Sequence, residues 1–378
     1  MEQIKEFLLE KKQAGLLRAL KPVSARHGVE IRLEDRDYID FSSNDYLGLA
    51  GHPRLVEASK KALQEFGTAS SASRLLSGDL AIHHQLEEAV ARFKNKESAL
   101  VFNSGYQANI GIISALYGKG DCIFSDRLNH ASIIDGIMFS GARFLRFKHN
   151  DMEQLEGLLK KERKGYKRGL IITETIFSMD GDRCPLKELV ALKREYDCQL
   201  MVDEAHATGI FGENGSGLVE EEGVSGQVDL IMGTFSKAMG GFGAYLASSQ
   251  EVVEYLINTS RSFIYSTALP PAVIACNIEA IKLIKDEPFR RKGLLESARY
   301  FRQALNEKAL RVKGDSQIVP LIIGDNIKTV EAARKLQEKG FWVLPIRPPT
   351  VPQGQARLRF SLSYNHGREV LDRLIEAL

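Results

Sequence analysis

The middle of the chain alternates short apolar runs with amphipathic stretches. The apolar runs predict seven strands, at Ala99–Phe102, Cys122–Ser125, Phe144–Phe147, Leu170–Thr175, Leu200–Asp203, Leu230–Thr234 and Ala244–Ala247. Apolar positions at helical spacing predict helices between several of them, including Gln107–Leu116, Met152–Lys161 and Leu186–Tyr196. Continuous apolar strands separated by helices are typical of a mostly parallel sheet that is covered on both faces. We therefore predict an α/β fold built on such a sheet.

The pattern changes after Pro270 and Pro271. Helices are predicted from Val273 to about Ala309, and they are followed by three strands, near Ile318–Ile323, Trp342–Leu344 and Arg357–Ser361. The first twenty residues also carry apolar positions at helical spacing, and we expect this helix to pack with the smaller domain. The predicted organisation is an N-terminal segment at 1–45, a large domain at 46–285 and a small α+β domain at 286–378.

The composition is that of an ordinary globular enzyme. Of the 378 residues, 44% are hydrophobic and 26% are charged, and the net charge is +2, so nothing favours a nucleic-acid binder. No apolar run is long enough to span a bilayer, and the N-terminus lacks the apolar core of a signal peptide. The four cysteines are scattered without a C-x-x-C pair, which argues against a zinc site or a disulfide framework and favours the cytoplasm.

Polar motifs follow several predicted strands. In an open α/β sheet, ligands bind at the carboxyl ends of the strands. One motif is T-F-S-K at 234–237, where Lys237 follows a strand and precedes small residues that would leave room for a flat group. A lysine amine forms Schiff bases with aldehydes when its pKa is lowered. A solvated surface lysine is the alternative.

A second motif is V-D-E-A-H at 202–206, in which Asp203 ends an apolar strand. A buried carboxylate there needs a cationic or hydrogen-bonding partner, and a protonated pyridine nitrogen would serve. A salt bridge to an arginine or a metal site are the alternatives. No other His or Cys lies nearby at ligand spacing, which argues against metal.

Two further motifs are weaker. The segment N-S-G-Y-Q-A-N at 103–109 opens a helix after a strand, and a helix N-terminus with a glycine suits a phosphate. No G-x-x-x-x-G-K-[ST] or G-x-G-x-x-G motif is present, which excludes the usual nucleotide and dinucleotide sites. In N-H-A-S at 129–132, His130 could stack on a flat ring, although a lone histidine is more often structural.

Together these segments resemble the α-oxoamine synthases, pyridoxal-phosphate enzymes with the aspartate-aminotransferase fold (fold type I). The resemblance extends from F-S-S-N-D-Y-L-G-L at 41–49 to A-R-L-R-F-S at 356–361, and it rests on N-H-A-S, F-S-M-D-G-D, V-D-E-A-H-A-T-G and T-F-S-K in that order. One departure is G-T-A-S-S-A-S-R-L-L-S-G at 67–78, where the family usually has a loop richer in glycine.

The resemblance implies a role for each matching residue. Lys237 would hold the cofactor covalently, Asp203 would pair with the pyridine nitrogen, and His130 would stack on the ring. The remaining cofactor contacts would come from His206 and Ser178 at the ring hydroxyl, and from Gly105, Tyr106 and Thr234. Ser266 and Thr267 would reach the phosphate in the neighbouring subunit of a homodimer. The substrates would meet Asn44, Arg359, Arg18 and Thr350, with Arg359 on the amino-acid carboxylate and Arg18 and Thr350 on the acyl side.

The segment I-R-P-P-T-V-P at 346–352 resembles the branch of the family that condenses L-alanine with a pimeloyl thioester in biotin synthesis. The implied reaction releases carbon dioxide and the free thiol carrier, which is coenzyme A or a carrier protein. The main alternative is the branch that joins glycine to an acetyl thioester. A plain aminotransferase and a pyridoxal-phosphate protein without turnover are alternatives of other classes.

Overall fold

The computed structural model describes residues 2–378 and divides the chain into two units. One unit combines Met1–Gly48, Met179–Asp182 and Lys292–Leu378, and the other combines Leu49–Ser178 and Arg183–Arg291. The hydrophobic pattern did not indicate that a short loop from the middle of the chain, Met179–Asp182, belongs with the terminal segments. Each unit is described by itself.

The second unit contains a seven-stranded sheet in the order β4-β10-β9-β8-β7-β5-β6. Strand β10 runs antiparallel to β4 and β9, and the other neighbouring pairs are parallel. The bounds are β4 Ser98–Phe102, β5 Cys122–Asp126, β6 Arg143–Phe147, β7 Gly169–Glu174, β8 Gln199–Asp203, β9 Leu230–Thr234 and β10 Ala244–Ser248. Each predicted strand in this region is present, and the predicted mostly parallel sheet is confirmed.

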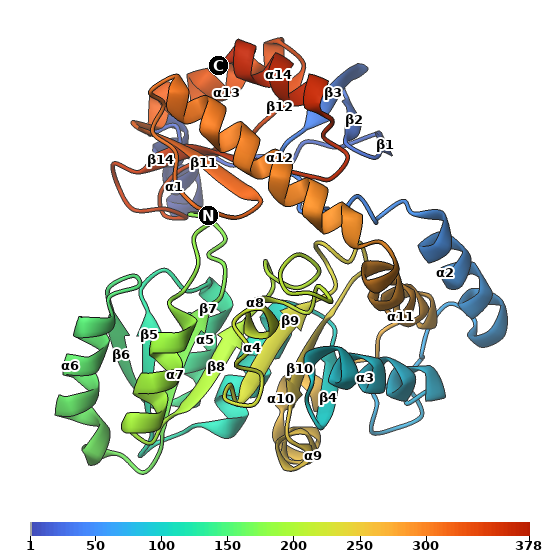
Figure 1. The fold of residues 1–378 in the computed structure, drawn as a ribbon, viewed down its shortest axis with the longest axis vertical. Helices are drawn as coiled ribbons and strands as arrows, with labels where there is room; N and C mark the ends of the chain where they lie inside the picture. Colours follow the sequence, from blue (N-terminus) through green and yellow to red (C-terminus); the bar gives the residue numbers. More distant parts are fainter. Residues whose placement is uncertain (1) are drawn as a thin grey trace. The chain divides into compact units, whose positions relative to one another are not determined.

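The helices of this unit lie mainly between the strands in sequence. They are α2 Pro53–Phe66, α3 Ala81–Lys94, α4 Gly105–Leu116, α5 Ala131–Ser140, α6 Met152–Glu162, α7 Leu186–Glu195, α8 Leu218–Glu221, α9 Gln250–Thr259, α10 Arg261–Ile264 and α11 Pro271–Asp286, with a short 3-10 turn at Arg163–Gly165. Figure 1 shows helices on both sides of the seven strands. The three helices predicted between strands correspond to α4, α6 and α7.

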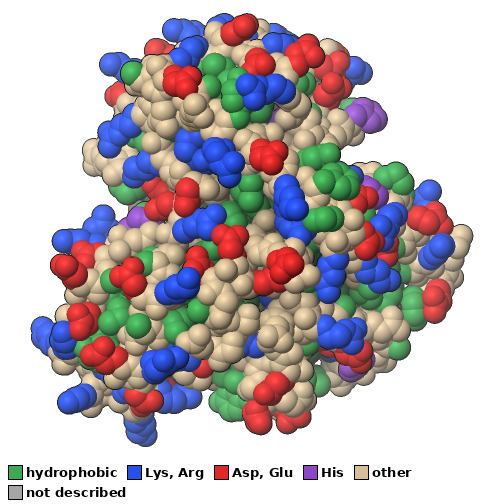
Figure 2. Space-filling view, viewed as in Figure 1, with side chains coloured by type: hydrophobic (Ala, Val, Ile, Leu, Met, Phe, Trp, Pro, Cys, Tyr) green, Lys and Arg blue, Asp and Glu red, His purple; other side chains and the backbone are tan. Residues whose placement is uncertain are grey.

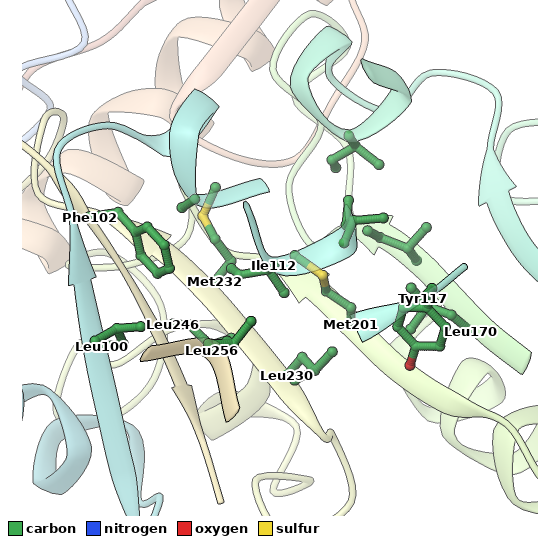
Figure 3. Packing of buried hydrophobic residues seen from close by; sticks show 14 of the residues in the cluster. Leu100, Phe102, Ile112, Tyr117, Leu170, Met201, Leu230, Met232, Leu246 and Leu256 are labelled. Atoms are coloured by element: carbon green, nitrogen blue, oxygen red, sulfur yellow. The ribbon is translucent and has the colours of Figure 1, made fainter. Parts of the chain in front are cut away.

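The core shows why continuous apolar strands are needed here. One buried cluster joins α4, α5, α9 and α10 to alternate residues of the strands, such as Leu170 and Ile172 in β7 and Leu230 and Met232 in β9 (Figure 3). The residues between them, such as Ile171, are also fully buried. Because successive side chains of a strand point to opposite faces, both faces of the sheet are covered.

The first unit holds two smaller sheets. Strands β11 Ile318–Gly324, β14 Ala356–Ser361 and β13 Pro345–Ile346 form one, and β1 Ala25–His27, β2 Glu30–Leu33, β3 Arg36–Asp40 and β12 Phe341–Trp342 form the other. Its helices are α1 Glu2–Gln13, α12 Pro288–Glu307, which begins in the other unit, α13 Asn326–Glu338 and α14 Arg368–Ala377. The predicted α+β character of the C-terminal region is confirmed.

Sequence analysis missed strands β1, β2 and β3. Strands β2 and β3 pair antiparallel and are joined by a two-residue turn, in which Glu34 and Asp35 have φ of 46° and 63°. Two residues between short strands are the feature of the sequence that could have indicated this hairpin. Only Ile31 and Leu33 of β2 are buried, so the alternation is short and easily overlooked.

On the face shown in Figure 2, Lys and Arg side chains lie among Asp and Glu side chains, in keeping with the small net charge. Within residues 2–378, no helix combines the length and the apolar character needed to cross a membrane.

Leu246 in β10 tests the packing of the central sheet, because it is completely buried in the main cluster. Replacing Leu246 by Ala should lower the free energy of unfolding by about 2–5 kcal/mol, through lost apolar burial and the cavity left behind. Urea denaturation would measure this loss. Leu63→Ala in α2 is the matched control, because Leu63 is 41% exposed. An equal loss for both variants would contradict the packing described.

Candidate active site

The carboxyl ends of the strands in the second unit surround a cavity of about 230 Å³. Its lining combines an amine, two imidazoles and two carboxyls with the start of α4: Gly105, Tyr106, Asn109, His130, Ser132, Glu174, Asp203, Ala205, His206, Met232, Thr234, Ser236 and Lys237. Seven of the residues predicted from the sequence are among them. The sheet brings them together because the parallel strands end at one edge.

Lys237 and His206 meet inside this cavity. The Lys237 Nζ lies 2.9 Å from the His206 Nε2. The loop that carries Lys237 is fixed by Thr234, whose hydroxyl donates to the Gly243 carbonyl at 2.8 Å and accepts from the Ser236 N–H at 3.1 Å. Thr234 therefore shapes the turn in which the lysine stands.

Gly240 and Gly241, which follow Lys237, pack against the protein's own chain. A Cβ built on Gly240 would lie 2.6 Å from the backbone of Leu49 and Ala50, and one on Gly241 would lie 2.1 Å from the Asn277 Oδ1. The expectation that these glycines leave room for a flat ligand is therefore wrong. They leave room for the protein's own chain.

Asp203 ends β8 and is 4% exposed. Its carboxylate accepts from the Asn109 side-chain amide at 3.0 Å and from the Ala205 N–H at 2.9 Å. Both donors are neutral, so they stabilise a carboxylate without cancelling its charge. Because the Asp203 carboxylate also lines the cavity, it can pair with a cationic group of a bound ligand.

A hydrogen-bond chain links His130 to Asp203. The Asn109 amide donates to both Asp203 and the Ser132 Oγ, and the Ser132 Oγ lies 2.8 Å from the His130 Nδ1. Because Nδ1 also accepts from the Ser132 N–H at 3.2 Å, the proton of the neutral ring belongs on Nε2. Sequence analysis assigned no role to Asn109 or Ser132, since only the fold aligns α4 with α5.

Burial of part of the ring lowers the pKa of His130; the nearby Asp203 opposes this shift and Lys237 adds to it. The Tyr106 ring stands edge-on to the imidazole, with ring centroids 6.5 Å apart, and its hydroxyl bonds to Asp135. A neutral His130 that lines the cavity suits contact with a planar group.

The N-terminus of α4 faces the same cavity at Gly105 and Tyr106. The Ser104 hydroxyl caps the helix by accepting from the Gln107 N–H, and the first intrahelical bond runs from Ala108 to Ser104. The N–H groups of Gly105 and Tyr106 precede that bond. They lie at the positive end of the helix, which suits a phosphate.

A buried ion pair supports the segment that carries Asp203 and His206. Lys94 donates to Glu204 at 2.6 Å and to the Thr208 hydroxyl at 3.0 Å, and both members of the pair are almost completely buried. The second Glu204 oxygen accepts from the Val219 N–H at 2.9 Å. The turn after β8 is thus fixed from the side away from the cavity.

Three predicted residues of this unit lie outside the cavity lining. The Ser178 N–H donates to Glu174 at 3.3 Å, so Ser178 stands next to a lining residue. The Ser266 hydroxyl donates to the Ser262 carbonyl at 2.7 Å, and Thr267 is exposed and pairs with Ser73 through a β-bridge.

The predicted substrate residues belong to the first unit and form two groups. Arg359 is 7% exposed, and its guanidinium donates to Asn44 at 3.3 Å, to Tyr46 at 3.2 Å and to Ser361. Arg18 donates to the Thr350 hydroxyl at 3.0 Å in an exposed setting.

Arg347 belongs with the second group. Burial lowers the pKa of Arg347, and the nearby positive charge of Arg18 lowers it further. Two guanidinium groups near one another in this way form a candidate site for an anion.

Comparison with known proteins gives the family. The profile of the aminotransferase class I and II family matches residues 36–378, so the chain belongs to that family. It is 51% identical to an 8-amino-7-oxononanoate synthase of Geobacter sulfurreducens over 98% of this chain and 95% of that protein. Among α-oxoamine synthases of known structure, a serine palmitoyltransferase from S. paucimobilis with bound PLP-myriocin is 31% identical, with a TM-score of 0.94 over 99% of this chain and 95% of that one.

An 8-amino-7-oxononanoate synthase from Francisella tularensis is also 31% identical, with a TM-score of 0.79 over 90% of this chain and 96% of that one. The chain is therefore an α-oxoamine synthase with a type I fold, as the sequence motifs predicted. The fold alone does not choose the substrates, since enzymes with different names share it.

The Lys94–Glu204 pair gives a test of how the site is supported. Lys94→Met should lower the free energy of unfolding by about 3–5 kcal/mol, because it leaves a buried carboxylate without its cation. The double variant Lys94→Met, Glu204→Gln removes both charges and should be more stable than Lys94→Met alone. Chemical denaturation of the three proteins measures the coupling. A double variant less stable than the single one would contradict it.

Proposed function

We propose that this protein uses pyridoxal phosphate to condense L-alanine with a pimeloyl thioester, the reaction of the 8-amino-7-oxononanoate synthases. The observation that carries the proposal is the placement of Lys237, His206 and Asp203 on one cavity, in a chain 51% identical to a protein of that name. The resemblance of I-R-P-P-T-V-P at 346–352 to the pimeloyl branch also supports it.

The residues present fit pyridoxal phosphate. Lys237 offers an amine for the aldehyde, and Asp203, held only by neutral donors, can take a protonated ring nitrogen. His130 offers a ring face, and the start of α4 at Gly105 and Tyr106 offers N–H groups for the phosphate. Each part of the cofactor thus meets a group of matching chemistry in the same cavity.

When bound, the cofactor supplies an electron sink for the breaking bonds at the amino-acid α-carbon. Asp203 would favour this by stabilising a positive charge at the ring nitrogen. Lys237 would hold the cofactor, and its amine, when free, would take up and return the α-proton. His206, 2.9 Å from the Lys237 Nζ, can orient that amine.

The two arginine groups of the first unit fit the two acidic ends of the substrates. Arg359 is held by Asn44 and Tyr46 and can form a forked contact with the alanine carboxylate. Arg18, Arg347 and Thr350 can bind the carboxylate that ends the pimeloyl chain. Acetyl thioester, the acyl substrate of the alternative branch, ends in a methyl group and has no such terminal carboxylate.

A product assay tests this choice of substrates. We expect more turnover with L-alanine and pimeloyl-CoA than with glycine and acetyl-CoA. Arg347→Gln should raise KM for pimeloyl-CoA by about tenfold or more, because a hydrogen bond to a charged group contributes about 1.5–3 kcal/mol, and it should leave KM for acetyl-CoA almost unchanged. Higher turnover with glycine and acetyl-CoA would place the chain in the acetyltransferase branch. Amino transfer to a 2-oxo acid without release of carbon dioxide would indicate an aminotransferase.

We also propose a homodimer in the cytoplasm in which Ser266 and Thr267 complete the partner's phosphate site. Several large apolar side chains of the second unit are exposed in the single chain, which supports a surface that a second subunit covers. They are Leu76 at 78%, Met138 at 66%, Phe139 at 71% and Tyr265 at 74%. A two-fold interface would make the same contribution in both directions. Four cysteines without a disulfide fit the reducing cytoplasm.

Subunit mixing tests the shared site. A Lys237→Ala subunit and a Ser266→Ala, Thr267→Ala subunit each lack one part of every site. In mixed dimers one site regains both parts, so we expect activity to reappear after subunit exchange. Exchange demonstrated by mass spectrometry without recovery of activity would show that each site is built within one chain.

A further inference from the structure

Glu174 stands beside Asp203 at the end of the sheet. Strands β7 and β8 are parallel, and these two residues are partners in the register. Glu174 is 3% exposed, Asp203 is 4% exposed, and both line the cavity. Two neighbouring carboxyls in a buried setting do not both ionise readily, because each negative charge disfavours the other.

The hydrogen bonds of the two carboxyls differ. Asp203 accepts a good hydrogen bond at each oxygen, from Asn109 and from Ala205. Glu174 accepts one long bond at Oε2, from the Ser178 N–H at 3.3 Å, and the backbone N–H of His130 also favours its charged form, but its buried Oε1 has no partner within hydrogen-bond distance. An ionised carboxyl accepts at both oxygens, so the carboxyl with fewer donors is the one that holds a negative charge less readily. The negative charge therefore belongs on Asp203 and the proton on Glu174.

The electrostatic surroundings agree with this division. Burial, and then the charge of Asp203, raise the pKa of Glu174 to about 8, while Lys237 acts in the opposite direction. The titratable groups that face Glu174 from neighbouring elements are Asp203 at the end of β8, Lys237 after β9, His130 before α5, and His206 after β8.

We propose that Glu174 is a positioning residue that carries a proton at neutral pH and so leaves Asp203 as the one negative charge near Lys237. A second carboxylate would stabilise the ammonium form of Lys237 and hold its proton. A neutral Glu174 leaves the amine freer to lose that proton, and thus to act as nucleophile and base. The inference rests on the proposed function only in giving Lys237 these tasks.

Infrared spectroscopy of the full-length protein, with and without pyridoxal phosphate, tests the proton directly. At about pH 6.5, well below that pKa, the wild type should show the carbonyl band of a protonated carboxylic acid. The band should titrate away with a midpoint near 8 and should be missing in Glu174→Gln. Glu88→Gln is the matched control, because the Glu88 side chain is 67% exposed. Survival of the band in Glu174→Gln, or its absence from the wild type, would overturn the inference.

Asp203→Asn tests the coupling without altering Glu174. Removal of the neighbouring negative charge should move the midpoint of the carbonyl band to lower pH. An unchanged midpoint would mean that burial alone protonates Glu174. This arm keeps the inference testable if Glu174→Gln does not fold.

The effect on Lys237 is tested by the rate at which added pyridoxal phosphate joins the protein, as the lysine amine replaces the aldehyde oxygen and water leaves. Above about pH 8, Glu174→Gln should react faster than the wild type, by up to about tenfold for each pKa unit that a second carboxylate would add to the lysine. Below that pH the ratio of the two rates should become constant. A ratio independent of pH throughout would contradict the link to Lys237. If pyridoxal phosphate fails to react with the wild type, the proposed function fails, while the infrared band still decides the state of Glu174.

Discussion

The Asp203 carboxylate, buried at the end of β8, is the charge on which the arrangement of the site depends. Its donors are the Asn109 amide and the Ala205 N–H, so its charge is stabilised but not neutralised within the chain's own hydrogen bonds. A carboxylate held in this way attracts a cationic ring nitrogen. It also disfavours a second charge on the adjacent Glu174 and, through Asn109 and Ser132, fixes the orientation of His130.

A second buried layer holds these groups in place from behind. Glu204 follows Asp203 in sequence, yet it faces Lys94, and the Lys94–Glu204 pair extends through Thr208 to the Tyr245 hydroxyl. Gly233 is needed beside this layer, since a Cβ there would lie 2.2 Å from the Tyr245 oxygen. Neighbouring carboxylates thus have separate tasks: one faces the cavity and the other anchors its own loop.

Much of this could be predicted from sequence, and the failures have identifiable causes. The seven strands and the motifs at their ends follow from apolar runs bounded by polar residues, which is why the sequence could predict that Lys237, Asp203 and His206 lie at one edge of the sheet. Glu174 was missed because its partner in β8 is set by strand register, which no local pattern reveals. The purpose of Gly240 was misjudged because the neighbouring chain comes from residues 49–50, far away in sequence. The β1–β3 strands are too short and too exposed to show a clear alternation.

Reduction with borohydride in the presence of pyridoxal phosphate, followed by peptide mapping, tests the central claim most directly. The account predicts one stable pyridoxyl adduct, located on Lys237, because this amine shares the cavity with Asp203 and lies 2.9 Å from His206. Lys94 is the internal control, since its amine is buried and paired with Glu204. An adduct on any other lysine, or no adduct at all, would contradict the account.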